Sequence, residues 1–203
     1  MIVHQLFPQP IYSSKLDRAL TKKELKTISQ YKKETNSNAG NMTSSENYVL
    51  ENKALNNLKK DLHTKVMDYF DKVICTDNLM APYITQSWIN YTKSDQFHHK
   101  HNHPNSLVSG IFYISADKEV DSITFHKAFL EDRIKLNTTK YNMFNSSSCT
   151  FPVETGELLL FRSSLVHGVG KKKGNNTRIS LSFNVFIKGT IGDNKSLTEL
   201  VLE

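Results

Sequence analysis

The chain has 203 residues, of which 38% are hydrophobic, 23% charged and 10% aromatic. This length and composition fit one ordinary domain with a sizeable core, and they exclude a disordered or collagen-like chain. No window approaches the roughly 18 uninterrupted apolar residues of a membrane span, and the start, Met1–Pro8, lacks the basic and apolar regions of a secretory signal. A cytoplasmic protein is therefore expected. Cys75 and Cys149 lie far apart and outside any CxxC motif, which argues against a disulfide framework or a Cys-based zinc site.

The net charge of +6 comes almost entirely from lysine. Of the 26 basic residues only four are arginine, namely Arg18, Arg133, Arg162 and Arg178. Lysine and asparagine enrichment with little arginine often reflects base composition of the genome rather than a binding surface. Each arginine therefore needs a reason, because lysine cannot reproduce its planar pair of donors.

The first 80 residues have a mostly helical pattern after a short extended start. Thr21 to Glu24 resembles a capping box, which predicts a helix over 21–34. The segment 35–46 is polar and predicts a loop, and apolar residues at helical spacing predict a second helix over 51–74. We expect a single domain, 1–203, in which the N-terminal helical part, 1–80, packs on a core formed by 81–190.

From Tyr83 onward the apolar period changes to two. The pattern predicts strands at about 83–93, 107–115, 121–127, 147–153, 157–162, 165–169 and 177–187. Several short strands at this spacing are typical of a β-sandwich or barrel. In the last strand, Ile179, Leu181, Phe183 and Val185 point one way, and Arg178, Ser180, Ser182 and Asn184 point the other. The second face can line a polar cavity.

Four of the eight histidines lie in the segment His98-His-Lys-His-Asn-His103. His101 and His103 fall on one side of an extended segment, and His167 lies near the end of a later strand. Neutral imidazole is a common metal ligand, suited to Fe, Zn, Cu or Ni. A His-rich loop is often only solvated and a lone histidine is often structural, but the combination of HxH with a distant histidine on strands is more specific than either part.

Arg178 lies 11 residues after His167, on the polar face of the predicted strand 177–187, and Ser180 is its neighbour on that face. An arginine holds a carboxylate through two parallel hydrogen bonds, and the serine hydroxyl can donate a third. The alternative for Arg178 is a surface ion pair. The pattern favours a carboxylate ligand beside the histidines.

These motifs resemble the 2-oxoglutarate/Fe(II)-dependent oxygenases. The signature of that family is HxD/E, a distal histidine and an arginine about ten residues later with a nearby Ser or Thr. Five segments are similar to a subfamily from marine bacteria and phages. They are Leu6–Tyr12, Ser87–Asn90, His101–Tyr113, Thr155–Phe161 and Arg178–Asn184. The resemblance implies a mainly β fold, a double-stranded β-helix (jelly roll, cupin-like) with N-terminal buttressing helices.

The chain departs from the signature at one position, where His103 stands in place of the carboxylate. Three neutral histidines leave the site one negative charge short of the usual two-His, one-carboxylate set. Some relatives resembling the aspartyl/asparaginyl β-hydroxylases keep function with two histidines. The registers His98 with His101, and His103 with Asn105, stay open.

The resemblance implies a dioxygenase with Fe(II) as cofactor and 2-oxoglutarate and O₂ as cosubstrates. It would couple oxidative decarboxylation of 2-oxoglutarate to hydroxylation of a substrate. His101, His103 and His167 would be the metal ligands and catalytic residues. Arg178, Ser180 and Asn90 would bind the cosubstrate. Asn184 and Tyr113 either face the same cavity or serve in packing.

Two other functions fit parts of the sequence. A cupin-like metal-binding module without oxygenase activity shares the HxH pair, but it leaves Arg178 without a role. The run Lys171–Arg178 offers a site for nucleic acid, but it reads more simply as a charged hairpin between strands 165–169 and 177–187. The substrate and the oligomeric state are not predicted, although 128–148 and 35–46 are candidate substrate covers.

Overall fold

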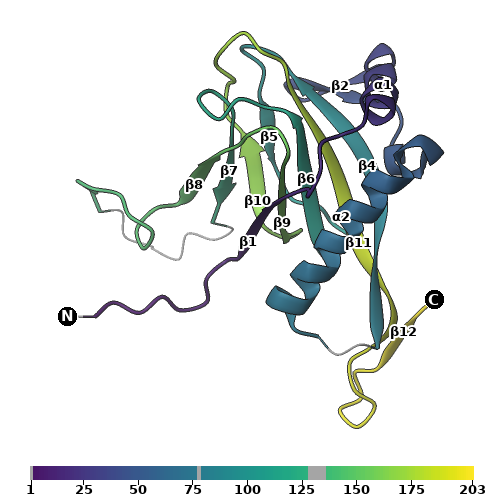
Figure 1. Ribbon diagram of the computed structural model, residues 1–203. Helices are drawn as coiled ribbons and strands as arrows, with labels where there is room; N and C mark the ends of the chain where they lie inside the picture. The colour runs from purple at the N-terminus through teal and green to yellow at the C-terminus, as the bar shows by residue number, and fades with distance from the viewer. Residues whose placement is uncertain (1, 77–78, 128–135) are drawn as a thin grey trace.

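The computed structural model describes residues 2–76, 79–127 and 136–203. Its strands form two antiparallel sheets (Figure 1). The larger sheet has the order β1-β9-β6-β11-β4-β3-β2, with β12 paired to β11. Its strands are β1 (Ile11–Lys15), β2 (Thr35–Asn38), β3 (Asn41–Ser44), β4 (Met80–Thr92), β6 (Val108–Ser115), β9 (Glu157–Arg162), β11 (Arg178–Ile191) and β12 (Leu200–Leu202). The smaller sheet has the order β5-β10-β7-β8, with β5 (His98–His101), β7 (Ser122–His126), β8 (Ser148–Pro152) and β10 (Val166–Val169).

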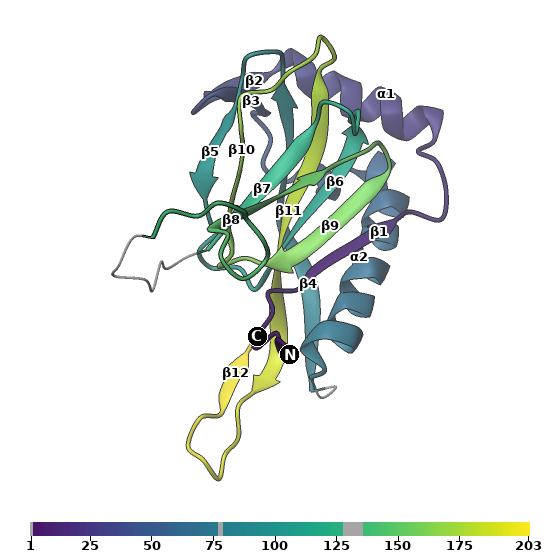
Figure 2. The ribbon, with the colours of Figure 1, turned by 90° about the vertical axis from the view of Figure 1, so that its left-hand side faces the viewer.

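Two helices cover the face of the larger sheet that points away from the smaller sheet (Figure 2). Helix α1 (Lys22–Gln30) begins with the predicted capping box, and a 3₁₀ turn, Tyr31–Lys33, follows it. Helix α2 (Asn56–Tyr69) continues into a π-helical turn, Phe70–Ile74. The apolar side of α2 is buried against the sheet, through Leu58, Leu62, Val66 and Tyr69. The helices therefore buttress the β-sheet core, as predicted.

Strand β11 divides its side chains between two environments. Leu181, Phe183 and Val185 belong to the core that the helices cover. Arg178 and Ser180 point the other way, into a cavity between the two sheets. The alternation of side chains along one strand thus separates the apolar core from a polar interior.

The segment 35–46, predicted to be a loop, instead contains the hairpin of β2 and β3. Met42 and Thr43 pair with β4, so the hairpin extends the larger sheet. Gly40 supports the turn with φ +96°, a conformation that glycine adopts without strain. The prediction was wrong because a polar edge strand is held by backbone pairing and shows no apolar alternation.

The predicted hairpin between strands 165–169 and 177–187 is also wrong. Strand β10 pairs with β5 and β7, whereas β11 pairs with β4, β6 and β12, so the connection crosses between sheets. Within it, Lys172 is buried, with its ammonium 3.4 Å from the carboxylate of Asp121. This buried ion pair anchors the crossover.

The proposed substrate cover 128–148 is only partly described, since 128–135 lie outside the described residues. Across the described ranges, no helix has the length and apolar character needed to cross a membrane. The other predicted strands begin and end within three residues of their expected bounds, except that β11 runs to Ile191, four residues beyond its expected end. Strands β5 and β12 were not predicted.

Candidate metal centre

Three histidines, on β5, just after β5 and on β10, converge between the sheets. His101 on β5 and His167 on β10 are directly paired, and their ring centroids lie 4.4 Å apart. His103 follows β5, and its backbone N–H donates to the carbonyl of Ser163 at 3.0 Å, which fixes the segment. One nitrogen of each of the three rings lies within 4.8 Å of the others. The antiparallel pairing of β5 with β10 is therefore what brings the sequence-distant histidines together.

Hydrogen bonds to Nδ1 orient all three rings. Nδ1 of His101 lies 2.8 Å from the carbonyl oxygen of His99, and Nδ1 of His167 lies 3.0 Å from that of Leu165. A carbonyl only accepts, so Nδ1–H is the donor in both rings and the lone pair is on Nε2. Metal-binding histidines commonly have this arrangement, in which the other ring nitrogen is held by a hydrogen bond.

His103 is held by side chains rather than by a backbone carbonyl. Its Nδ1 lies 2.6 Å from Asn184 Oδ1 and 3.0 Å from Ser109 Oγ. Asn184 and Ser109 are partners across β11 and β6. Ser109 in turn bonds to Ser163 at 2.9 Å, so a buried hydroxyl chain supports the ring. These hydroxyl contacts were not predicted from the sequence, although Asn184 was predicted to lie on the inward face of its strand.

Burial keeps the three imidazoles neutral. Burial, with a smaller contribution from the neighbouring imidazoles, lowers the pKa of His167 to about 3. Burial also lowers the pKa of His101 and of His103 below the usual range. Neutral imidazole is the form that binds metal, so the donor set fits a divalent transition ion such as Fe(II), Zn(II) or Ni(II). No carboxylate is among the described residues that line this cavity.

Arg178 is a buried cation in the same cavity as the histidines, with 3% of its surface exposed. Its Nη1–H donates to the carbonyl of Ser122 at 3.0 Å, and its Nε–H has no partner among the described residues. Burial lowers its pKa, yet a guanidinium stays charged at neutral pH. No described carboxylate forms a salt bridge with it. A buried charge without a counter-ion is costly, so the site favours an anionic ligand.

Asn90 and Ser180 lie beside Arg178 on paired strands. The two are direct partners across β4 and β11, and Ser180 also pairs with Tyr113 on β6. Asn90 Nδ2 donates to Ser182 Oγ at 3.0 Å, which leaves its Oδ1 without a partner among the described residues. Tyr113 is fully buried, and burial raises the pKa of its hydroxyl. Asn90 Oδ1 thus adds an unsatisfied acceptor to the cavity wall.

All six predicted site residues line this one cavity: Asn90, His101, His103, His167, Arg178 and Ser180. His98, from one alternative register, lines it too. Asn105, from the other, lines only the groove outside the cavity. The cavity is narrow, with a volume of about 20 Å³, which is space for about one water molecule.

A larger groove of about 840 Å³ opens directly outside the histidines. His98, His101 and His103 line both the groove and the cavity, so they separate the two spaces. Among its described lining residues none is Asp, Glu, Lys or Arg. The wall is instead rich in amides and aromatic rings, through Asn38, Asn47, Asn102, Asn105, Asn184, Gln86, Tyr83, Trp88 and Phe186.

Fold and site together define a double-stranded β-helix protein with a candidate three-histidine metal centre. Residues 86–184 match the family model described as "Putative 2OG-Fe(II) oxygenase". Over these residues the chain is therefore similar to that family. A comparison with curated proteins finds no significant match.

Several solved structures share the fold at low sequence identity. HygX from Streptomyces hygroscopicus, with nickel and 2-oxoglutarate bound, has a TM-score of 0.57 and 12% identity, covering 87% of this chain and 82% of that one. A prolyl-4-hydroxylase from Pseudomonas putida has a TM-score of 0.55 and 11% identity, covering 87% and 92%. SnoN, a non-heme alpha ketoglutarate dependent epimerase from nogalamycin biosynthesis, has a TM-score of 0.57 and 12% identity, covering 89% and 81%.

Proposed function

We propose that the protein is a 2-oxoglutarate- and Fe(II)-dependent dioxygenase that hydroxylates its substrate. In the balanced reaction, 2-oxoglutarate and O₂ give succinate and CO₂, and one oxygen atom enters the substrate C–H bond. We also propose that it belongs with the marine bacterial and phage subfamily that its motifs resemble. The observation that carries the proposal is Arg178, a buried cation with no carboxylate partner among the described residues, in one cavity with three oriented, neutral histidines.

In this proposal His101, His103 and His167 hold Fe(II) through Nε2, since Nδ1 is engaged in each ring. The bound iron would supply the activation of O₂. Arg178 and Ser180 would bind the distal carboxylate of 2-oxoglutarate, and Asn90 would contact the cosubstrate between the two ends. The chemistry of Arg178 supports this assignment. A carboxylate would neutralise its charge and accept from its Nε–H, which has no partner among the described residues.

The narrow cavity implies that the cosubstrate is admitted by rearrangement of side chains. A five-carbon dicarboxylate is much larger than the single water that about 20 Å³ can hold. Arg178 can exchange its bond to the Ser122 carbonyl for one to the ligand. The scaffold of paired strands need not move for this exchange.

The outer groove supports an uncharged, hydrogen-bonding substrate. An acidic or basic substrate would lose hydration there without meeting an opposite charge among the described lining residues. Amide side chains both donate and accept, and the rings of Tyr83, Trp88 and Phe186 offer apolar contact. The structural neighbours include both a hydroxylase and an epimerase, so the product must be identified directly.

The test measures 2-oxoglutarate binding and succinate release by the purified protein. We expect the Ni(II)-loaded protein to bind 2-oxoglutarate in a calorimetric titration, and the Fe(II)-loaded protein to release succinate in air. Neutral polar compounds should raise the release more than carboxylates or amines do. Metal binding without 2-oxoglutarate binding would refute the proposal and favour the cupin-like alternative.

A further inference from the structure

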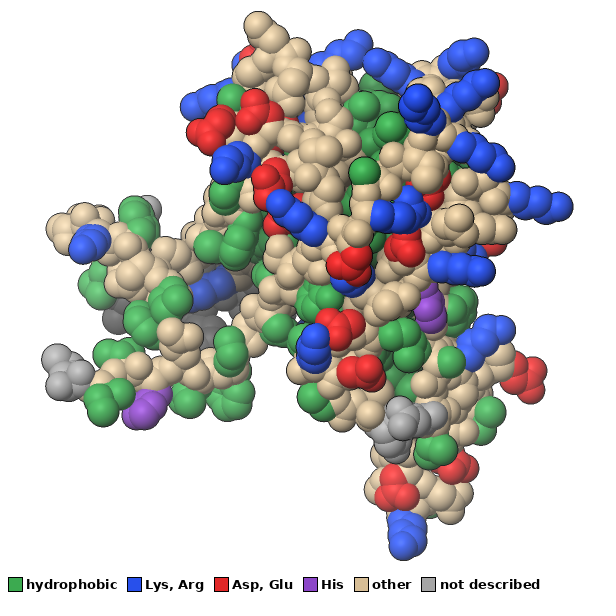
Figure 3. Space-filling view, in the orientation of Figure 1, with side chains coloured by type: hydrophobic (Ala, Val, Ile, Leu, Met, Phe, Trp, Pro, Cys, Tyr) green, Lys and Arg blue, Asp and Glu red, His purple; other side chains and the backbone are tan. Residues whose placement is uncertain are grey.

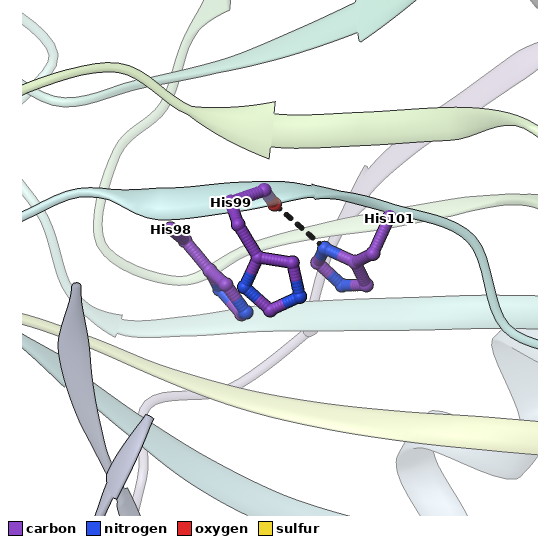
Figure 4. Close-up of side chains that lie close together, drawn as sticks. All are labelled: His98, His99 and His101. Atoms are coloured by element: carbon purple, nitrogen blue, oxygen red, sulfur yellow. Dashed lines mark hydrogen bonds between the residues drawn. The ribbon is translucent and has the colours of Figure 1, made fainter. Parts of the chain in front are cut away.

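A β-bulge in β5 turns successive histidines to the same side of the strand. His101 lies opposite His167 and His98 opposite Val169, so three steps along β5 face two steps along β10. The extra residue interrupts the normal alternation. The rings of His98, His99 and His101 consequently lie together beneath β5 (Figure 4). The ring centroids of His98 and His101 are 4.5 Å apart, and those of His99 and His101 are 4.9 Å apart.

We propose that His98, His99 and His101 form a second binding position for a divalent transition-metal ion. One nitrogen of each ring lies within 4.8 Å of the others. Three imidazoles are a donor set that suits Fe, Ni, Cu and Zn. His99 is exposed, whereas His167 of the first set is buried, so the second position is the one that meets solvent. An ion can therefore bind there without entering the cavity.

The two positions share His101, and the geometry allows His101 to serve only one at a time. Its Nδ1–H donates to the His99 carbonyl at 2.8 Å, as Figure 4 shows, so the ring has one free lone pair, on Nε2. The protein thus holds one ion that occupies either position. The inference rests on the proposed function only for the role of the first position, and the second position stands on its own geometry.

Asn38 on the β2–β3 hairpin competes with the metal for His98. Asn38 Nδ2 lies 3.1 Å from His98 Nε2. The Asn38 Oδ1 accepts from the N–H of Ala39, which turns the NH₂ group towards His98 as the donor. The second bond of Nδ2, to Asn41 Oδ1 at 3.0 Å, supports the same amide orientation. If His98 binds the metal through Nε2, it needs the lone pair that now accepts from Asn38. If His98 binds through Nδ1, its Nε2 carries the hydrogen and faces the amide donor of Asn38. Either way the Asn38 contact must break.

The experiment is a Co(II) titration followed by absorption spectroscopy and calorimetry. The wild type should bind one ion. H103A/H167A, which removes two ligands of the first set, should still bind one ion, at least tenfold more weakly. Adding H99A should weaken that residual binding by a further tenfold or more, whereas adding H126A should leave it unchanged. N38A in the double variant should strengthen the residual binding.

Circular dichroism establishes that each variant is folded, and H103Q/H167Q replaces H103A/H167A where the latter is not. Two ions in the wild type would refute the shared ligand. Absence of residual binding, or residual binding that survives H99A, would refute the second position. A failure of the proposed function shows separately, as absence of 2-oxoglutarate binding by the wild-type protein loaded with one metal ion.

Discussion

The role proposed for Arg178 rests on its burial rather than on its charge alone. The chain has 26 basic side chains, but the guanidinium of Arg178 lies in the cavity of the three histidines with no described carboxylate beside it. Its Nε–H, which has no partner among the described residues, can donate to a carboxylate. The sequence indicated this because arginine is scarce in the chain and because Arg178 follows His167 on the inward side of a strand.

Replacing Arg178 by lysine should weaken 2-oxoglutarate binding about 10- to 100-fold, because the loss of one charge-assisted hydrogen bond costs roughly 1.5–3 kcal/mol. Calorimetric titration of the Ni(II)-loaded variant measures this directly. The affinity for Ni(II) itself should change little, which is the internal control. An unchanged 2-oxoglutarate dissociation constant would show that Arg178 does not bind the ligand.

If His103 binds a metal as proposed, Asn184 is a positioning residue that acts through the His103 ring. Its Oδ1 accepts from His103 Nδ1 at 2.6 Å. Removing such a partner commonly lowers metal affinity about 10- to 100-fold. Asn184→Ala should therefore weaken Ni(II) binding by this factor, and Asn184→Asp, which keeps an acceptor oxygen, should restore most of it. If the alanine and aspartate variants bind equally, orientation of His103 is not the reason.

At the scale of elements, the start of α1 is the clearest case in which local sequence determines local structure. The Thr21 side chain and the Glu24 carboxylate cap each other's backbone. Arg18 adds two hydrogen bonds to the Glu24 carboxylate, at 2.7 and 2.8 Å. The pKa of Glu24 is lowered to about 2, and the hydrogen bonds from Arg18 are the largest cause. The capping box was predicted, but the arginine lies before the helix and no periodicity indicates its contact.

The Glu24 carboxylate should make stability depend on pH. Its pKa is lowered on folding, from 4.5 to about 2, so its contribution is complete above about pH 4.5 and disappears as the pH falls towards 2. Glu24→Gln should reduce the free energy of unfolding by roughly 2 kcal/mol at pH 7 and by almost nothing near pH 2. Urea unfolding at both pH values tests this. A difference that stays constant with pH would contradict the assignment.

The elements that sequence reasoning missed share one property, namely that backbone pairing rather than side-chain pattern defines them. β2 and β3 are polar and join the sheet edge through Met42 and Thr43. β5 consists of histidines and a lysine, and its bulge has no sequence signal. Without the bulge, the alternation rule would send His98 and His99 to opposite sides. The second metal position is therefore visible only in the structure.

Across the whole molecule, the site depends on contacts between residues far apart in the chain. The residue types and their order predicted which side chains converge, because a resemblance to a known signature supplied the pairing. The narrow cavity, the outer groove and the crossover after β10 could not be predicted, since each depends on how two sheets pack together. The connection beyond β10 illustrates this, because Lys172 reads as a surface charge but is buried against Asp121.

The burial of Lys172 argues against nucleic-acid binding by the basic run 171–178. Of the basic run, Lys172 and Arg178 are buried and Lys171 pairs with Asp95 at 3.0 Å. Over the face seen in Figure 3, acidic side chains lie among the basic ones. Fluorescence anisotropy at about 150 mM salt should therefore give duplex DNA affinities no tighter than the micromolar range of non-specific binding. Much tighter binding that K171A/K173A abolishes would contradict this expectation.

The most direct measurement of the central claim is a crystal structure with Ni(II) and an unreactive analogue of 2-oxoglutarate. We expect the metal to be bound by Nε2 of His101, His103 and His167, with the distal carboxylate of the analogue on the guanidinium of Arg178. A metal ion that does not touch His167, or a distal carboxylate bound away from Arg178, would contradict the claim.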